Sequence, residues 1–237
     1  MSAPLLDVSN LTARYGLAQV LFGVSLTLAP GEVAALVGRN GAGKSTTLKA
    51  ILGLVTRAAD RLAFDGHDIT ALPPYRVARL GLGYVPEERR IFTDLTVEEN
   101  LEVGRQPSRD KRAAWTPERL FEIFPNLAEM RGRQASRMSG GEQQMLTIAR
   151  TLMGNPSAVL LDEPSEGLAP VIVEQMAEAV RAMKREGVAV LLSEQNLAFA
   201  GAIADRALVI DKGAIVFAGE MRAFVADTAL RERYLGV

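Results

Sequence analysis

The N-terminal third of the chain has the pattern of short β-strands separated by turns. Apolar and polar residues alternate, and a Pro30-Gly31 turn precedes a continuous apolar run. The segments with strand patterning are 5–12, the alternation Val24, Leu26 and Leu28, the run 33–37, and 61–64 with its Asp65-Gly66 turn. After residue 43, helical spacing is shown by Leu48, Ile51, Leu52 and Leu54, with Gly53 as a stop signal. We therefore predict an antiparallel β part that leads into a strand, a glycine-rich loop and a helix.

The C-terminal third alternates between strand and helix patterns. The predicted strands are 158–161, 188–192, 207–210 and 214–218, and the predicted helices are 171–186 and 197–202. A short helix at 74–80 and a strand at 83–85 precede the middle of the chain. This alternation indicates an α/β fold with a mostly parallel sheet and crossover helices.

The middle of the chain lacks strand patterning and is predicted to be helical. Thr96 can cap a helix, with Glu99 as its capping-box partner, and 118–124 has a second helical pattern. No repeat or low-complexity linker separates this region from its neighbours. We expect one domain over 1–237, with a helical subdomain at approximately 90–155 inserted into the α/β core.

Composition narrows the classes of partner. The 237 residues include 27 Lys plus Arg and 28 Asp plus Glu, and no Cys. A net charge of −1 gives no electrostatic reason to bind nucleic acid, and the lack of Cys excludes disulfides and thiolate metal sites. The N-terminus has no secretory signal pattern, and the apolar runs are far shorter than the roughly 20 residues that cross a bilayer. We expect a cytoplasmic protein that binds no nucleic acid and is not inserted directly into the membrane.

Residues 38–45 read GRNGAGKS and match the phosphate-loop pattern G-x-x-x-x-G-K-[ST]. Glycines allow successive backbone N–H groups to surround an anion, and the following helix adds its positive end. Lys44 would neutralise the β- and γ-phosphates, and the Ser45 hydroxyl would bind Mg²⁺. The nucleotide-binding candidates here are Gly38, Asn40, Gly41, Ala42, Gly43, Lys44, Ser45 and Thr46. The loop alone leaves kinases, GTPases, recombinases and transport ATPases open.

Two carboxylates follow the predicted strand 158–161. The carboxyl end of a parallel strand is where doubly wound sheets bind ligands. Asp162 would hold Mg²⁺, mostly through water, and Glu163 would orient and deprotonate an attacking water. The alternative is an ordinary solvated strand end, which explains one carboxylate more easily than two.

A third motif points to one class of ATPase. Residues 138–144, MSGGEQQ, begin a predicted helix, and Ser139 with Gly140 and Gly141 would present hydroxyl and N–H groups at its positive end. In combination with the phosphate loop and the carboxylates, this resembles the signature motif of ATP-binding cassette (ABC) ATPases, usually LSGGQ. The resemblance implies a site completed by ATP on a second subunit. It also places Tyr15 where the family stacks an aromatic ring on adenine, and 164–170 where it has a dimer-contacting loop.

Two positions depart from the usual family pattern. Glu87 stands where most members have Gln, and Gln195 stands where most have a switch His. The only His, His67, lies in a predicted turn, so no imidazole is available as a base. Glu87 becomes a candidate Mg²⁺ ligand, and Gln195 a candidate donor to the γ-phosphate. The phrases around these positions resemble the ATPases of branched-chain amino acid importers, in particular the shorter of that system's two ATPase subunits.

The resemblance implies an ATPase that uses ATP and Mg²⁺ on the inner face of the cell membrane. Its implied partners are a second ATPase subunit, two transmembrane permease subunits and, indirectly, an extracytoplasmic solute-binding protein. A groove near 87–100, with Ile91, Phe92 and Leu95, would receive a helix of the permease. Two alternatives remain open: a urea or short-chain amide importer, and a module in which ATP joins subunits without hydrolysis.

Overall fold

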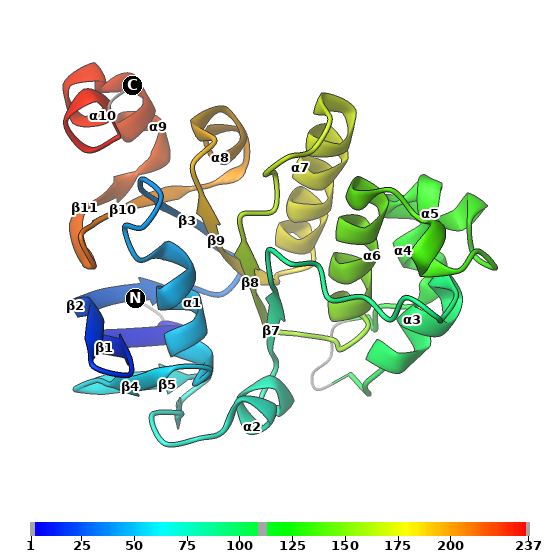
Figure 1. The fold of residues 1–237 in the computed structure, drawn as a ribbon, viewed down its shortest axis with the longest axis horizontal. Coiled ribbons are helices and arrows are strands. Elements are labelled where there is room, and N and C mark those ends of the chain that lie inside the picture. Colours follow the sequence, from blue (N-terminus) through cyan, green and yellow to red (C-terminus); the bar gives the residue numbers. More distant parts are fainter. Residues whose placement is uncertain (1–2, 109–112, 236–237) are drawn as a thin grey trace.

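The computed structural model describes residues 3–108 and 113–235 and contains a six-stranded sheet at its centre (Figure 1). Its strands are β3 (Val33–Val37), β7 (Leu82–Val85), β8 (Ala158–Asp162), β9 (Ala189–Glu194), β10 (Arg206–Asp211) and β11 (Ala214–Glu220). The order is β11-β10-β3-β9-β8-β7, and β11 alone is antiparallel to its neighbour. The predicted α/β fold with a mostly parallel sheet is confirmed.

Each face of this sheet packs on its own hydrophobic core. In β3, Val33, Ala35 and Val37 belong to one core, whereas Ala34 and Leu36 belong to the other. A strand buried on both faces is apolar at every position, which is why the run 33–37 shows no alternation. Six helices of the described residues lie outside the middle segment 90–155. They are α1 (Lys44–Leu52), α2 (Pro74–Arg79), α7 (Pro170–Arg185), α8 (Leu197–Ile203), α9 (Met221–Ala226) and α10 (Thr228–Tyr234).

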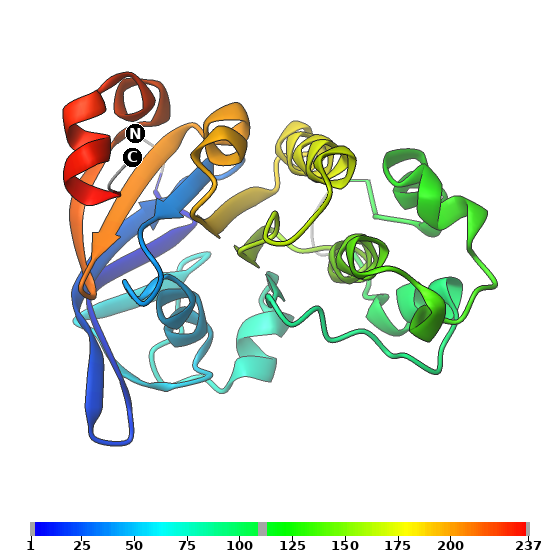
Figure 2. The ribbon, with the colours of Figure 1, turned by 45° about the horizontal axis from the view of Figure 1, so that its top comes forward.

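A separate antiparallel sheet covers the side of the molecule that carries α1 (Figure 2). Its strands are β1 (Leu6–Tyr15), β2 (Ala18–Leu28), β4 (Thr56–Ala58), β5 (Arg61–Phe64) and β6 (His67–Asp68). The predicted turn at Asp65-Gly66 is confirmed, since Phe64 pairs with His67, and His67 is exposed as expected. The first strand extends to Tyr15, three residues past its predicted end, because β1 and β2 continue to pair through register shifts.

The helices of the middle segment lie together at one end of the molecule (Figure 1). They are α3 (Val97–Gly104), α4 (Pro117–Ile123), α5 (Pro125–Glu129), the 3-10 helix η1 (Ala135–Arg137) and α6 (Gly140–Leu152). The predicted capping box is present: Thr96 N–H donates to Glu99 Oε2 at 2.8 Å, and Glu99 N–H donates to Thr96 Oγ1 at 3.2 Å. All strands of the described residues lie outside 90–155. The division of 1–237 into one domain with this subdomain stays a prediction.

The described helices include none that is both long and apolar enough to cross a bilayer. The two C-terminal helices, α9 and α10, were not predicted. Both are short: α9 has six residues, too few for its apolar pair Met221 and Phe224 to form a recognisable period, and α10 has no buried residue.

Candidate nucleotide site

The candidate site lies where four parallel strands end at one edge of the central sheet. The phosphate loop follows β3, and Glu87 follows β7. Asp162 ends β8 with Glu163 directly after it, and Gln195 follows β9. Strand pairing sets these ends beside one another, since Val37 pairs with Glu194 and Asp162 with Ser193. This is the edge at which open α/β sheets bind their ligands.

Glycine is required at two points of the phosphate loop. Gly43 has φ 110° and is the N-cap of α1, a backbone conformation that side chains disfavour. A β-carbon on Gly38 would lie 3.3 Å from Cβ of Ala42 and would clash with the Ile210 carbonyl oxygen. The loop therefore turns tightly enough to direct the first N–H groups of α1 toward an anion.

Lys44 is buried and fully engaged within the chain. Its Nζ donates to the carbonyl oxygens of Gly38 at 2.9 Å and Arg39 at 3.1 Å, and forms an ion pair with Glu163 Oε1 at 3.0 Å. Ser45 is half-buried, and its hydroxyl has no hydrogen bond within the described part of the chain. Lys44 thus already holds an anionic oxygen, and Ser45 has a free oxygen for a ligand.

Asp162 is held by two hydroxyl groups. Ser193 Oγ donates to its Oδ1 at 2.7 Å, and Tyr84 Oη donates to its Oδ2 at 3.0 Å. Burial, followed by the charge of Asp162 and its hydrogen bond, raises the pKa of Tyr84, so the phenol remains a donor. The oxygens of Ser45 and Asp162 are hard ligands that suit Mg²⁺ with several waters. The described residues contain no cluster of three metal-binding side chains, so the remaining ligands would come from nucleotide and water.

Glu163 stands in a left-handed conformation, φ 45°, with its N–H donating to Ser193 O at 3.1 Å. Its Oε2 accepts from Gln195 Nε2 at 3.0 Å, and the same Nε2 donates to Asn40 Oδ1 at 2.5 Å. Burial raises the pKa of Glu163, but hydrogen bonds from Glu166, Lys44 and Gln195 and the charge of Lys44 outweigh it, so the net direction is down. The carboxylate is ionised at neutral pH, as a base must be.

Other candidates lie apart from this cluster. Tyr15 is 48% exposed at the end of β1, and Ser139 is exposed at the start of α6. Glu87 is exposed and reaches the cluster only through Glu163, with which it lines a cavity of about 250 Å³. Ser139 caps α6: its Oγ accepts from Glu142 N–H at 3.4 Å, and its N–H donates to Glu142 Oε2 at 2.6 Å. Among the described residues, no hydrogen bond joins Ser139 to the phosphate loop.

Three contributing residues were missed in the sequence. Tyr84 and Ser193 hold Asp162, and Glu194 Oε1 accepts from Ser165 N–H at 3.0 Å. Burial raises the pKa of Glu194 above its ordinary value. Its hydrogen bonds with Ser165 and with the backbone of the two following residues oppose this effect but are weaker than it. Pairing of 158–161 with 188–192 would have pointed to Ser193, but nothing local indicated this register.

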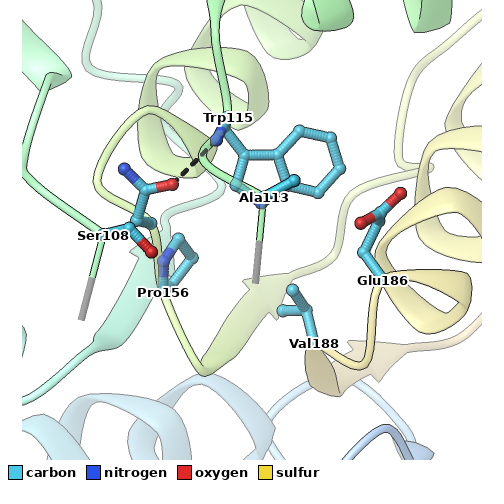
Figure 3. A pocket seen from close by; sticks show the side chains of 7 residues that line it. Ser108, Ala113, Trp115, Pro156, Glu186 and Val188 are labelled. Atoms are coloured by element: carbon cyan, nitrogen blue, oxygen red, sulfur yellow. Dashed lines mark hydrogen bonds between the residues drawn. The ribbon is translucent and has the colours of Figure 1, made fainter. Parts of the chain in front are cut away.

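A small cavity lies at the opposite edge of the sheet (Figure 3). Trp115 N–H donates to Asn155 Oδ1 at 2.8 Å, and Pro156, Glu186 and Val188 complete much of the wall. Pro156 and Val188 precede β8 and β9, so this edge is the amino end of the strands. A volume of about 10 Å³ holds about one water molecule, which excludes it as a nucleotide site.

Comparison with known proteins defines the class. A model of the family described as "ABC transporter" matches residues 21–166. The high-affinity branched-chain amino acid transport ATP-binding protein BraG of Pseudomonas aeruginosa is 41% identical, covering 98% of this chain and 100% of the relative. The lipopolysaccharide export system ATP-binding protein LptB of Haemophilus influenzae is 33% identical, covering 98% and 97%. A solved structure of MJ1267, an ATP-binding cassette of an ABC transporter in its ADP conformation, is 27% identical, with TM-score 0.82 and full coverage of both chains.

An α/β core with a phosphate loop after β3, two carboxylates at the end of β8 and an α6 that is capped by Ser139 and begins with two glycines defines a nucleotide-binding protein. The chain belongs to the ABC transporter family.

Proposed function

We propose that this chain hydrolyses ATP, with Mg²⁺, to drive import of branched-chain amino acids through partner membrane subunits. The observation that carries the proposal is the position of Glu163, ionised and 3.0 Å from Lys44, directly after Asp162. A site that only bound ATP would have no use for a carboxylate where water must attack. The substrate class rests on the 41% identity to BraG, against 33–34% to the lipopolysaccharide exporters.

ATP is proposed to bind in a site shared by two subunits. The phosphate loop with Lys44, Ser45 and Asp162 supplies one side, and Ser139 with its two glycines supplies the other from a second ATPase subunit. Two observations support this arrangement: Ser139 is exposed, and its side chain bonds to Glu142 within α6 rather than to the phosphate loop of its own chain. Tyr15, about half exposed, is available to stack on adenine.

The permease is proposed to dock in a groove of about 630 Å³ between α2, α3 and α6. Exposed apolar side chains line it, namely Leu54, Tyr75, Phe92 and Val103. Its lining residues include Arg79 and Arg150 but no carboxylate, which suits an apolar helix that carries a negative charge. Of the three residues expected here, Phe92 lines the groove, whereas Ile91 packs against the core and Leu95 is half-buried elsewhere.

The test is transport by the assembled system. The chain is purified together with a second ATPase, permease subunits and a solute-binding protein of one importer, and reconstituted in vesicles. Leucine or valine should stimulate ATP hydrolysis and enter the vesicles, and Glu163→Gln should abolish both. Stimulation by urea or acetamide alone would favour the amide importer, and ATP binding without turnover would favour the non-hydrolysing module.

A further inference from the structure

Arg89 lies directly on the first residue of α6. A β-carbon built on Gly140 would be 2.9 Å from Cζ and 3.1 Å from Nη2 of Arg89, and closer still to Nη1. Non-bonded atoms do not approach β-carbons this closely, so the glycine leaves the space that the guanidinium occupies. The positive group therefore rests on the backbone between Ser139 and Gly141.

The backbone of Arg89 is fixed by the same helix. Its φ is 65° and that of Arg90 is 43°, two consecutive left-handed residues that are not glycine. Thr147 Oγ1 donates to the carbonyl of Arg89 at 2.5 Å, and Arg150 Nη2 donates to the carbonyl of Arg90 at 2.6 Å. Such a conformation is unfavourable by itself and persists because α6 holds it, a pattern typical of functional sites.

No described residue neutralises this guanidinium by an ion pair or a hydrogen bond. The helix start contributes a partial positive charge of its own, so two like charges meet there. Glu142 lies in the first turn, but its carboxylate is engaged by the Ser139 N–H. The acidic groups across the neighbouring cavity are Glu87, Glu163 and Glu166. An unpaired cation at a helix start is the arrangement that attracts an anionic ligand.

The cavity beside Arg89 holds a second unpaired group. Gln144 is 3% exposed, and its Oε1 is buried without a hydrogen-bond partner. It lies in the second turn of α6 and lines the same cavity as Arg89 and Glu163. A buried polar atom without a partner indicates that a group from outside the chain completes the site. Because Oε1 is an acceptor, the group that it meets must be a donor such as water or an N–H of the second subunit, and a phosphate is left to the guanidinium of Arg89.

We propose that Arg89 is a phosphate-binding residue: together with Ser139, Gly140 and Gly141 it contacts the phosphates of ATP held by the second ATPase subunit. Ser139 and the glycines supply only neutral donors, and Arg89 adds the charge that they lack. The inference rests on the shared site proposed above and names a residue of it that the signature motif does not contain. Arg90 is the matched control, because its side chain is exposed and pairs with Glu88 at 3.8 Å.

The first measurement is ATP-dependent dimerisation in the Glu163→Gln background. Light scattering gives the mass at each ATP concentration, and the midpoint is the ATP concentration at which half of the protein is dimeric. Loss of a charged hydrogen bond predicts that Arg89→Ala raises the ATP midpoint about tenfold or more. Arg89→Lys should recover part of the loss, and Arg90→Ala should leave the midpoint unchanged. ATP binding to the separate chain should be equal in all variants, because the phosphate loop is intact.

The second measurement asks which ATP Arg89 contacts. A Lys44→Ala chain is mixed with an Arg89→Ala chain in the otherwise unmodified protein, and ATP hydrolysis is measured. If Arg89 acts on the partner's ATP, one shared site carries both changes and the other is intact, so mixing restores activity. If Arg89 acts on ATP of its own chain, both sites are damaged and mixing restores nothing.

The outcomes separate this inference from the proposed function. A Glu163→Gln protein that forms no ATP-dependent dimer would overturn the shared site and the role of Arg89 with it. Two results would overturn the role of Arg89 alone. One is a dimer that forms equally well in Arg89→Ala, and the other is an Arg90→Ala variant whose dimerisation is weakened as much as that of Arg89→Ala. Unfolding temperatures without nucleotide, equal across the variants, verify that each one folds.

Discussion

Replacing Glu163 by Gln separates ATP binding from ATP hydrolysis. Glu163 accepts from Lys44 Nζ through Oε1 and from Gln195 Nε2 through Oε2, both at 3.0 Å. Glutamine has nearly the same volume and keeps one oxygen for Lys44, but it cannot accept a proton from water. Lys44 also loses the carboxylate that competes with phosphate for its charge, so ATP should bind at least as well as before.

The size of each effect follows from the burial of the pair, with side chains 3% and 8% exposed. Removing one partner of a buried ion pair costs about 3–5 kcal/mol, an upper limit here because the amide retains a hydrogen bond. ATP at about one hundred times its Kd should restore about 2.7 kcal/mol. The rate should fall about 10²- to 10⁴-fold, which corresponds to about 2.7–5.4 kcal/mol in the activation barrier.

Two assays measure these changes. In thermal unfolding without ATP, Glu163→Gln should unfold at a lower temperature than the unmodified protein. Adding ATP should raise the unfolding temperature of the variant. ATPase turnover with the partner subunits present should show the loss of rate. Turnover within a few fold of the unmodified protein would refute the role of Glu163, and loss of the ATP-induced stabilisation would refute the claim that binding survives.

Three further predictions concern the groups around this centre. Mixing a Lys44→Ala chain with a Ser139→Ala chain should restore part of the ATPase activity, because one shared site is intact; equal inactivity of every pairing would contradict shared sites. Glu87→Gln should raise the Mg²⁺ concentration needed for hydrolysis, since an amide oxygen is a weaker ligand than a carboxylate, and an unchanged requirement would leave Glu87 as a solvated loop residue. The hydrogen bond with Glu163 and the charge of Glu163 raise the pKa of Glu166 from 4.5 to about 7, so stability present at low pH should be lost as the pH rises through about 7. Glu166→Gln should flatten that decline in unfolding temperature, and an equal decline in the variant would show that other groups cause it.

The local elements of this site were predictable from the sequence. The apolar run 33–37, the glycines of the phosphate loop and the start of α1 depend on residues that are neighbours in the chain. The caps at Thr96 and Ser139 are equally local, because each joins groups three residues apart. Strand ends in doubly wound sheets carry ligands, so Asp162 was identified by its position after a buried strand.

Other features needed information from distant parts of the chain. The contacts of Asp162 with Tyr84 and Ser193 depend on the register of β7, β8 and β9. Nothing in the sequence distinguishes Arg89 from Arg90 beside it, and its place on Gly140 appears only when the loop after β7 packs on α6.

Residue type and short spacing set the chemistry available to this protein, because they fix which groups can cap a helix, surround a phosphate or bind a proton. Tertiary structure decided which of these groups meet. Lys44 and Glu163 form an ion pair because the strands that precede them, β3 and β8, are close in the sheet. Only β9 lies between these two strands, and all three end at the same edge. Ser139 is not part of this cluster, since it caps α6, which begins in the helical part of the chain. Strand order and packing between segments far apart in the chain are set by the shared burial of many side chains, and no short motif encodes them.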